Sequence, residues 1–169
     1  TQVLPKQELR WGGTGQGAAN VAMGAPFPSS SQVSATPMVA NLDDDNGDGK
    51  IDERDIPEIV FMTYCGTDVS SNGIVRAIHG GGAKKGKDYF AECGTTVWHE
   101  GDNLNMACPC ANAVGNSTSV LAVADLDGDG VPEIIVVDET QGLRILDNRG
   151  VLITQSGPAQ WAGYPVPAV

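Results

Sequence analysis

Carboxylates recur at alternate positions of a short glycine-rich stretch in the second half of the chain. Positions 1, 3, 5 and 9 of this stretch are Asp125, Asp127, Asp129 and Glu133, with glycine at positions 4 and 6. Alternate side chains of a tight loop can direct their oxygens at one centre, and Ca²⁺ takes about six to eight oxygen ligands. Glycine lets the backbone turn where a Cβ would clash. The stretch therefore predicts a calcium loop, and a run of branched apolar residues after it predicts a strand.

A second acidic stretch fits a 12-residue loop of the EF-hand type. Oxygen ligands at positions 1, 3, 5, 7, 9 and 12 would come from Asp44, Asn46, Asp48, Lys50, Asp52 and Asp55, with glycine at position 6. The last ligand is Asp, as in dockerin-type loops, in place of the bidentate Glu. Strands are predicted on both sides of this loop, so it shares only the ligand geometry of an EF-hand. We expect one Ca²⁺ here, and Asn41, Asp43 and Glu58 are candidates for an additional Ca²⁺ site.

The acidity of the chain is concentrated in these two stretches. The net charge is -11, and fourteen of the 21 acids lie in residues 43–58 and 125–139. Carboxylates crowded in this way repel one another unless a cation neutralises them, which favours a metal over solvated turns. Ca²⁺ is preferred to Mg²⁺, which keeps its waters. With 10 Lys and Arg, the chain is a poor candidate for nucleic-acid binding, and no apolar run reaches the ~18 residues of a membrane span.

The elements that would position these loops occur twice. Residues 36–43 align with 120–127, residues 57–61 with 132–136, and residues 74–78 with 142–146. Such repeats indicate stacked supersecondary units. Strands are predicted at residues 38–42, 58–64 and 74–79 of the first unit and 119–126, 133–138 and 143–147 of the second, with fourth strands that end near Trp98 and Trp161.

Four antiparallel strands per unit are typical of a propeller blade. We therefore expect an all-β fold of four-stranded antiparallel blades, with the calcium loops between the first and second strands. Residues 1–35 would be the end of a preceding blade, including Trp11, plus a loop. Residues 36–117 and 118–163 would be two blades, the first with an inserted calcium loop and a long cysteine-containing hairpin, and residues 164–169 would begin a further blade.

The repeated loops and strands resemble the FG-GAP/VCBS-type repeat family, the calcium-loop blades of integrin-α-like β-propellers. The resemblance covers residues 36–80 and 118–169 and is most specific at residues 124–135. It implies Ca²⁺ bound between the first two strands of a blade. The implied ligands of the second loop are Asp125, Asp127, Asp129, the main-chain carbonyl of Val131, and Glu133. It also implies an extracellular protein, as in many secreted bacterial proteins.

The four cysteines point to an oxidising compartment. They are Cys65, Cys93, Cys108 and Cys110. Two disulfides are expected, and four cysteines allow three pairings. Residues 108 and 110 are too close to pair without strain, so we favour one bond from each of them to Cys65 and Cys93. A zinc site is the alternative, although the single-residue spacer is unusual for zinc.

We find no convincing catalytic motif in the sequence. Residues 81–87 match the spacing of a phosphate-binding loop, but Asp88 stands where the loop needs Ser or Thr. We therefore expect a non-enzymatic extracellular module with a structural and adhesion or recognition role, with a protein or glycan ligand at the cell surface. The alternatives are a filament subunit assembled from copies by strand exchange, and an ancillary propeller of a secreted hydrolase or lyase. Asn116 is the acceptor residue of a glycosylation sequon.

Overall fold

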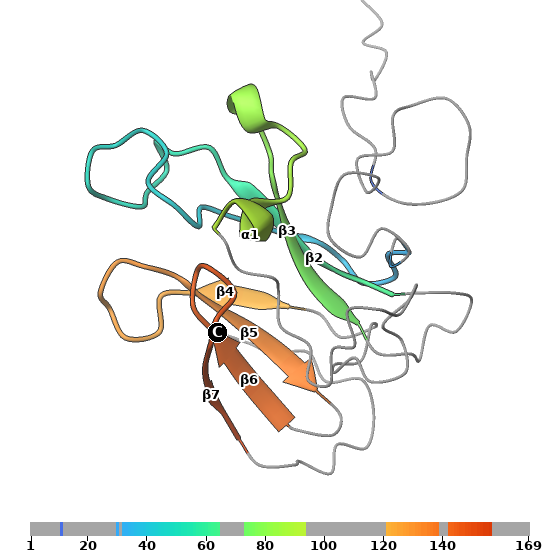
Figure 1. Ribbon diagram of the computed structural model, residues 1–169. Helices are drawn as coiled ribbons and strands as arrows, with labels where there is room; N and C mark the ends of the chain where they lie inside the picture. The colour runs from blue at the N-terminus through green and yellow to red at the C-terminus, as the bar shows by residue number, and fades with distance from the viewer. Residues whose placement is uncertain are drawn as a thin grey trace, which may run out of the picture.

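A computed structural model describes residues 11, 30, 32–64, 73–93, 121–138 and 142–156, which form two antiparallel sheets (Figure 1). The first sheet has the order β1 (Met38–Ala40), β2 (Glu58–Thr63), β3 (Ile74–His79). The second has the order β4 (Ala122–Ala124), β5 (Glu133–Asp138), β6 (Gly142–Leu146), β7 (Leu152–Gln155). Each sheet is a meander in which neighbours in sequence are neighbours in space, so the predicted all-β class is confirmed.

The predicted central strands are close to those in the structure. β3 and β5 have the predicted bounds, and β2 ends one residue earlier than expected. The first strand of each unit is shorter than predicted, because the acidic loop leaves the sheet directly after the last paired residue, Ala40 or Ala124. The fourth strand of the second unit, β7, ends at Gln155 and not near Trp161. Trp161 and the predicted fourth strand near Trp98 lie outside the described residues, so the first sheet shows three strands.

The first sheet is buried on both faces along β3 and most of β2. All six residues of β3 are buried, including Arg76 and His79. On one face, Arg76 pairs with Asp88 at 3.6 Å and lies over the ring of Trp11, whose ring also contacts Phe61. Burial on both faces explains why this strand reads as a nearly continuous apolar run and not as an alternation. Trp11 covers a sheet face, but its predicted strand lies outside the described residues.

The opposite face contributes to a single core that joins the two sheets. Its buried members come from both units: Leu42, Val60, Met62, Val75, Ala77, Tyr89, Phe90, Leu121, Ile134, Val136 and Leu146. Alternate positions of β2 and β5 point into this core, as the two-residue period of a strand requires. Residues of β1 also approach β4. Because the sheets share a core, the loops that follow β1 and β4 project from the same side of the molecule, as the cyan and orange loops show (Figure 1).

A short helical segment covers one end of the first sheet. The 3-10 turn η2 (Gly82–Lys84) is followed by α1 (Tyr89–Glu92), which has a single turn. A phosphate-binding loop would lead into a much longer helix, so the rejection of that motif agrees with the local structure. The rings of Tyr89 and Phe90 in α1 lie in the shared core. Among the described residues, no helix has the length and apolarity that a membrane crossing would need.

Candidate metal centre

The second acidic loop starts and ends at one place, because the strands on either side of it pair. Ala124, the last residue of β4, is the register partner of Glu133, the first residue of β5. Asp125 and Glu133 therefore lie side by side. Carboxylate oxygens of Asp125, Asp127 and Glu133 all lie within 4.8 Å of one another. Within the described part of the chain, this is where three potential metal ligands converge.

Main-chain amides hold the second loop in its curved shape. Asp125 accepts hydrogen bonds from the N–H groups of Gly128 (2.7 Å) and Gly130 (2.9 Å) on its two carboxylate oxygens. Asp129 accepts the N–H of Val131 at 2.7 Å. The two glycines have φ of +81° and +87°, which side chains with a Cβ rarely adopt. The glycine spacing seen in the sequence is therefore the spacing that this loop conformation needs.

Glu133 closes the loop from the strand that follows it. One carboxylate oxygen, Oε2, accepts the N–H of Leu126 at 2.8 Å. Glu133 is buried, whereas Asp125 and Asp127 are exposed. Three carboxylates this close repel one another, and an oxygen-only group of this kind suits a hard divalent cation. The residues present thus fit a Ca²⁺ site. Asp129 lies on the same loop but outside this group of three carboxylates, and the main-chain carbonyl of Val131 stays a predicted ligand.

The first acidic loop repeats this hydrogen-bond pattern around Asp44. Asp44 accepts the N–H groups of Gly47 (2.7 Å) and Asp48 (3.0 Å) on Oδ1, and that of Gly49 (2.7 Å) on Oδ2. Asp125 binds the amides three and five residues ahead in the same way. Asp48 in turn accepts the N–H of Lys50 at 3.1 Å. Asp44 is thus the local counterpart of Asp125, as position 1 of the predicted 12-residue loop requires.

The far end of the first loop returns to its beginning through Asp55. Asp55 is buried and accepts the side-chain amide of Asn46 at 2.8 Å and the N–H of Asp52 at 2.8 Å. Positions 3, 9 and 12 of the predicted ligand set are therefore in contact. The predicted loop closes on itself between strands, without the helices of an EF-hand.

Arg54 occupies the space beside the carboxylates of the first loop. Its guanidinium pairs with Asp48 at 2.9 Å and with Asp52 at 2.6 Å. The hydrogen bonds from Arg54 lower the pKa of Asp52 to about 2. The structure therefore pairs these two predicted ligands with the guanidinium of Arg54. Among the described residues, the first loop has no group of three converging carboxylates like that of the second loop. A metal ion would compete with Arg54 for Asp48 and Asp52.

The base of the first loop holds a second set of polar groups. Oε2 of Glu58 accepts the N–H of Leu42 at 2.9 Å, as Glu133 does with Leu126 in the other unit. Oδ1 of Asn41 and Oδ1 of Asp43 are buried atoms without a hydrogen-bond partner. Buried acceptors without a donor are rare and costly. A cation held by Asn41, Asp43 and Glu58, the additional ligand set predicted from the sequence, would satisfy both.

The electrostatic environment where the first loop leaves the sheet also disfavours ionised carboxylates without a bound cation. Burial, together with the nearby Asp43 and Asp45, raises the pKa of Glu58 to about 7. Burial and Asp45 raise the pKa of Asp43. Nδ1 of His79 lies 3.2 Å from the other Glu58 oxygen, Oε1. The sequence reading missed His79, although strand register would have found it, since Glu58 and His79 are direct partners in β2 and β3.

The cysteine predictions are only partly within the described structure. Cys93 has a free thiol and packs against the shared core. Cys65, Cys108 and Cys110 lie outside the described residues, as does Asn116. The free thiol of Cys93 differs from the disulfide predicted for this residue, and the pairing of the other three cysteines stays a prediction.

Comparison with known proteins gives one informative similarity. No protein-family model matches the chain, and no curated protein matches it. The crystal structure of the V. cholerae biofilm matrix protein Bap1 is similar, with 29% sequence identity and a TM-score of 0.65. The similarity covers 90% of this chain and 21% of that protein. The chain therefore spans about a fifth of the length of the protein that it resembles, and the FG-GAP/VCBS resemblance stays a prediction.

Proposed function

We propose that this chain is a calcium-binding repeat module of an extracellular bacterial protein, with a structural and adhesion role. The observation that carries the proposal is the convergence of Asp125, Asp127 and Glu133 within 4.8 Å. The similarity to a biofilm matrix protein supports an extracellular, matrix-associated role. We propose no catalytic function for it.

Calcium would act here by joining the ends of paired strands. Asp125 follows β4 directly and Glu133 begins β5, so a cation between them would fix the connection of the two strands. It would also remove the repulsion among the carboxylates, which couples cation binding to folding. The proposed ligands of this loop are Asp125, Asp127, Asp129, the Val131 carbonyl and Glu133.

Two further sites are proposed in the first unit. The 12-residue loop would use Asp44, Asn46, Asp48, Lys50, Asp52 and Asp55, with the main-chain carbonyl at position 7. The base of the loop would use Asn41, Asp43 and Glu58. The unpartnered oxygens of Asn41 and Asp43 support the base site, and the amide cradle around Asp44 supports the loop site.

We also propose that the two sheets are successive blades of an FG-GAP/VCBS-type β-propeller. The second sheet is a four-stranded antiparallel meander, and in the first sheet β3 and most of β2 are buried on both faces, as they would be in stacked blades. Residues 36–117 and 118–163 would be the two blades, with parts of neighbouring blades in residues 1–35 and 164–169. The rest of the propeller would come from a longer protein.

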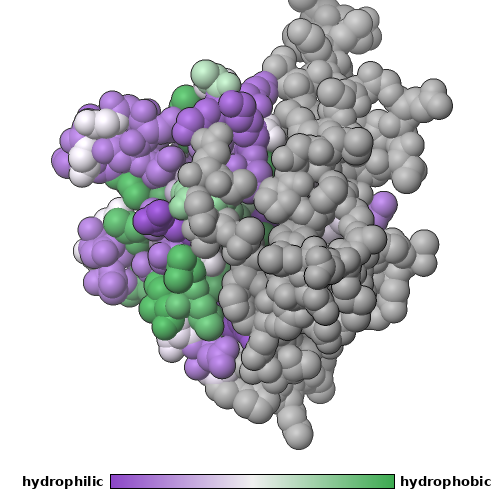
Figure 2. All heavy atoms as spheres, in the orientation of Figure 1, coloured by the Kyte–Doolittle hydropathy of each residue, from purple (hydrophilic) through white to green (hydrophobic). Residues whose placement is uncertain are grey.

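One observation favours a second candidate, a filament subunit that adds strands to its neighbours. β7 is the edge strand of the second sheet and pairs only with β6 in the described structure. Ile153 on this strand is 56% exposed, and Val151 just before it is 47% exposed. The space-filling view shows a hydrophobic patch among polar side chains on the visible face (Figure 2). An exposed apolar edge is a template for strand addition.

Thermal unfolding in EDTA, with Ca²⁺ or Mg²⁺ added back, tests the calcium proposal. With a Kd of about 10⁻⁴ M, 10 mM Ca²⁺ would stabilise the folded chain by ~2.7 kcal/mol for each independent site. That corresponds to a rise in melting temperature of roughly 5–10 °C. The Glu133→Gln variant should lose part of this rise, whereas Glu53→Gln, an exposed carboxylate outside the proposed ligand sets, should keep it. Equal effects of Ca²⁺ and Mg²⁺, or none, would contradict the proposal.

A further inference from the structure

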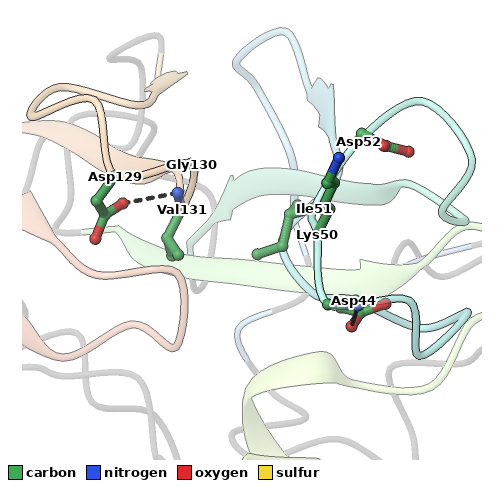
Figure 3. A pocket seen from close by; sticks show the side chains of 8 residues that line it. Asp44, Lys50, Ile51, Asp52, Asp129, Gly130 and Val131 are labelled. Atoms are coloured by element: carbon green, nitrogen blue, oxygen red, sulfur yellow. Dashed lines mark hydrogen bonds between the residues drawn. The ribbon is translucent and has the colours of Figure 1, made fainter.

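The two acidic loops face each other across a pocket. Its volume is about 390 Å³, within the ~300–1,000 Å³ of typical ligand pockets. The first loop contributes Asp44, Lys50, Ile51 and Asp52 to the lining, the second contributes Asp129 and Val131, and each loop adds a glycine. Figure 3 shows Ile51 and Val131 on the two sides of this space, with the side chain of Ile51 extending toward the second loop. The pocket therefore has an apolar centre made by both units.

Carboxylates form the rim of the pocket, and the loops around it stay acidic even with cations bound. Residues 44–55 hold six acids and two bases, a net charge of -4, and residues 125–133 hold four acids and no base, also -4. One divalent cation in each loop would leave each at -2. The potential in the pocket thus favours a cationic group whether or not calcium is present.

We propose that this pocket binds a basic side chain, arginine or lysine, presented by a partner protein. The methylene stem would lie between Ile51 and Val131, and the charged head would lie at the rim, where the remaining net negative charge of both loops attracts it. Long basic side chains bury their stems against apolar surface in this way while the charge stays at the edge. A saccharide is less suited, because none of the eight lining residues is an aromatic ring on which a sugar could stack.

Binding of a basic side chain in this pocket rests on the adhesion role proposed above and not on calcium binding. Lys50 and Val131 enter the proposed metal sites only through main-chain carbonyls, so their side chains can be changed without removing a metal-binding oxygen. Lys50 is the single base on the rim. Its replacement by Glu should strengthen binding of a cation, whereas a lysine in place of Val131 should fill the pocket with a competing charge.

The test uses ¹H–¹⁵N NMR of the full chain in saturating Ca²⁺ and in EDTA. The probe is the blocked tripeptide Gly-Arg-Gly, and the matched control peptide carries citrulline, which keeps the shape of arginine and removes its charge. The arginine peptide should shift the amide signals of Gly49, Lys50, Gly130 and Val131, and the citrulline peptide should not.

The variants make the same test specific to the pocket. Lys50→Glu should tighten the Kd of the arginine peptide by about threefold, Val131→Lys should abolish its binding, and Glu53→Gln, in the same loop but outside the pocket, should match the wild-type chain. Equal binding of both peptides, shifts elsewhere, or shifts caused by a neutral oligosaccharide and not by arginine would overturn the proposal. A missing response to Ca²⁺ together with intact arginine binding would refute only the calcium proposal.

Discussion

The side-chain amide of Asn148 donates a 2.8 Å hydrogen bond to the main-chain carbonyl oxygen of Leu42, at the start of the first acidic loop. Asn148 lies in the turn between β6 and β7 of the second sheet, so this bond joins one unit to the loop of the other. Glu58 binds the N–H of the same Leu42 from within the first sheet. The loop base is therefore fixed from both sides.

Removal of the Asn148 side chain should loosen this connection. We expect Asn148→Ala to lower the free energy of unfolding by about 0.5–1.5 kcal/mol, because the carbonyl of Leu42 loses its shorter donor and keeps the 3.4 Å hydrogen bond from the Tyr89 hydroxyl. Hydrogen exchange should become faster at the loop base, at Leu42 and Asp43. The exposed β7 residue Gln155, replaced by Ala, is the matched control and should change stability by less than ~0.5 kcal/mol. Unchanged exchange at the loop base would argue against the coupling of the two units.

Gly150, in the same turn, packs directly on Phe90 of α1. A Cβ at this position would lie 3.0 Å from two ring carbons of Phe90, and the residue has φ of +82°. Gly150→Ala should therefore cost the ~1 kcal/mol of a positive φ plus a packing penalty, about 2–3 kcal/mol in total. Gly47→Ala is the control, because its φ is +75° but its Cβ would meet nothing within 4 Å. Chemical denaturation of both variants measures the difference. Equal losses of unfolding free energy would show that the Phe90 ring moves aside without a packing penalty.

The raised pKa of Glu58 predicts a pH dependence in calcium-free protein. A carboxyl group whose pKa rises from 4.5 unfolded to about 7 folded binds its proton more tightly in the folded state. Its contribution therefore destabilises the fold progressively as the pH rises from about 4.5 to 7. In EDTA, the free energy of unfolding of Glu58→Gln should exceed that of the wild-type chain by roughly 1–3 kcal/mol at pH 7 and by little at pH 4.5.

The measurement is urea denaturation of both proteins across this pH range. Subtraction of the two profiles removes the contributions of other titrating groups. A difference that stays constant with pH would show that Glu58 is ionised throughout. In saturating Ca²⁺ the order at pH 7 should reverse, because the variant lacks a proposed ligand.

Arg54 should weaken calcium binding in the first loop, since it pairs with Asp48 and Asp52. We expect Arg54→Gln to tighten the Kd for Ca²⁺ at this loop by roughly threefold, as expected for the loss of an exposed competing charge. The pKa of Asp52 should rise toward its ordinary value at the same time. Calorimetric titration with Ca²⁺ measures the first effect and NMR titration the second. Weaker calcium binding by the variant would mean that Arg54 orders the loop more than it blocks it.

The acidic loops could be predicted from the sequence because their contacts are local. Asp125 binds amides three and five residues ahead, and Asp44 does the same. Such contacts follow from residue spacing and from the positive φ that glycine permits. The central strands β3 and β5 could also be predicted from the sequence, because each is a run of branched apolar residues with turn residues on both sides.

Residue spacing thus determined the local loop geometry and the class of each central strand. Tertiary structure alone decided which distant groups meet: Asn148 with Leu42, and the two loops around the pocket. It also decided the position of β7 at the edge of the second sheet. These contacts depend on strand register and on the packing of two sheets around one core, which bring together residues far apart in the chain. No local pattern specifies such contacts, because their energy comes from burial shared by both units.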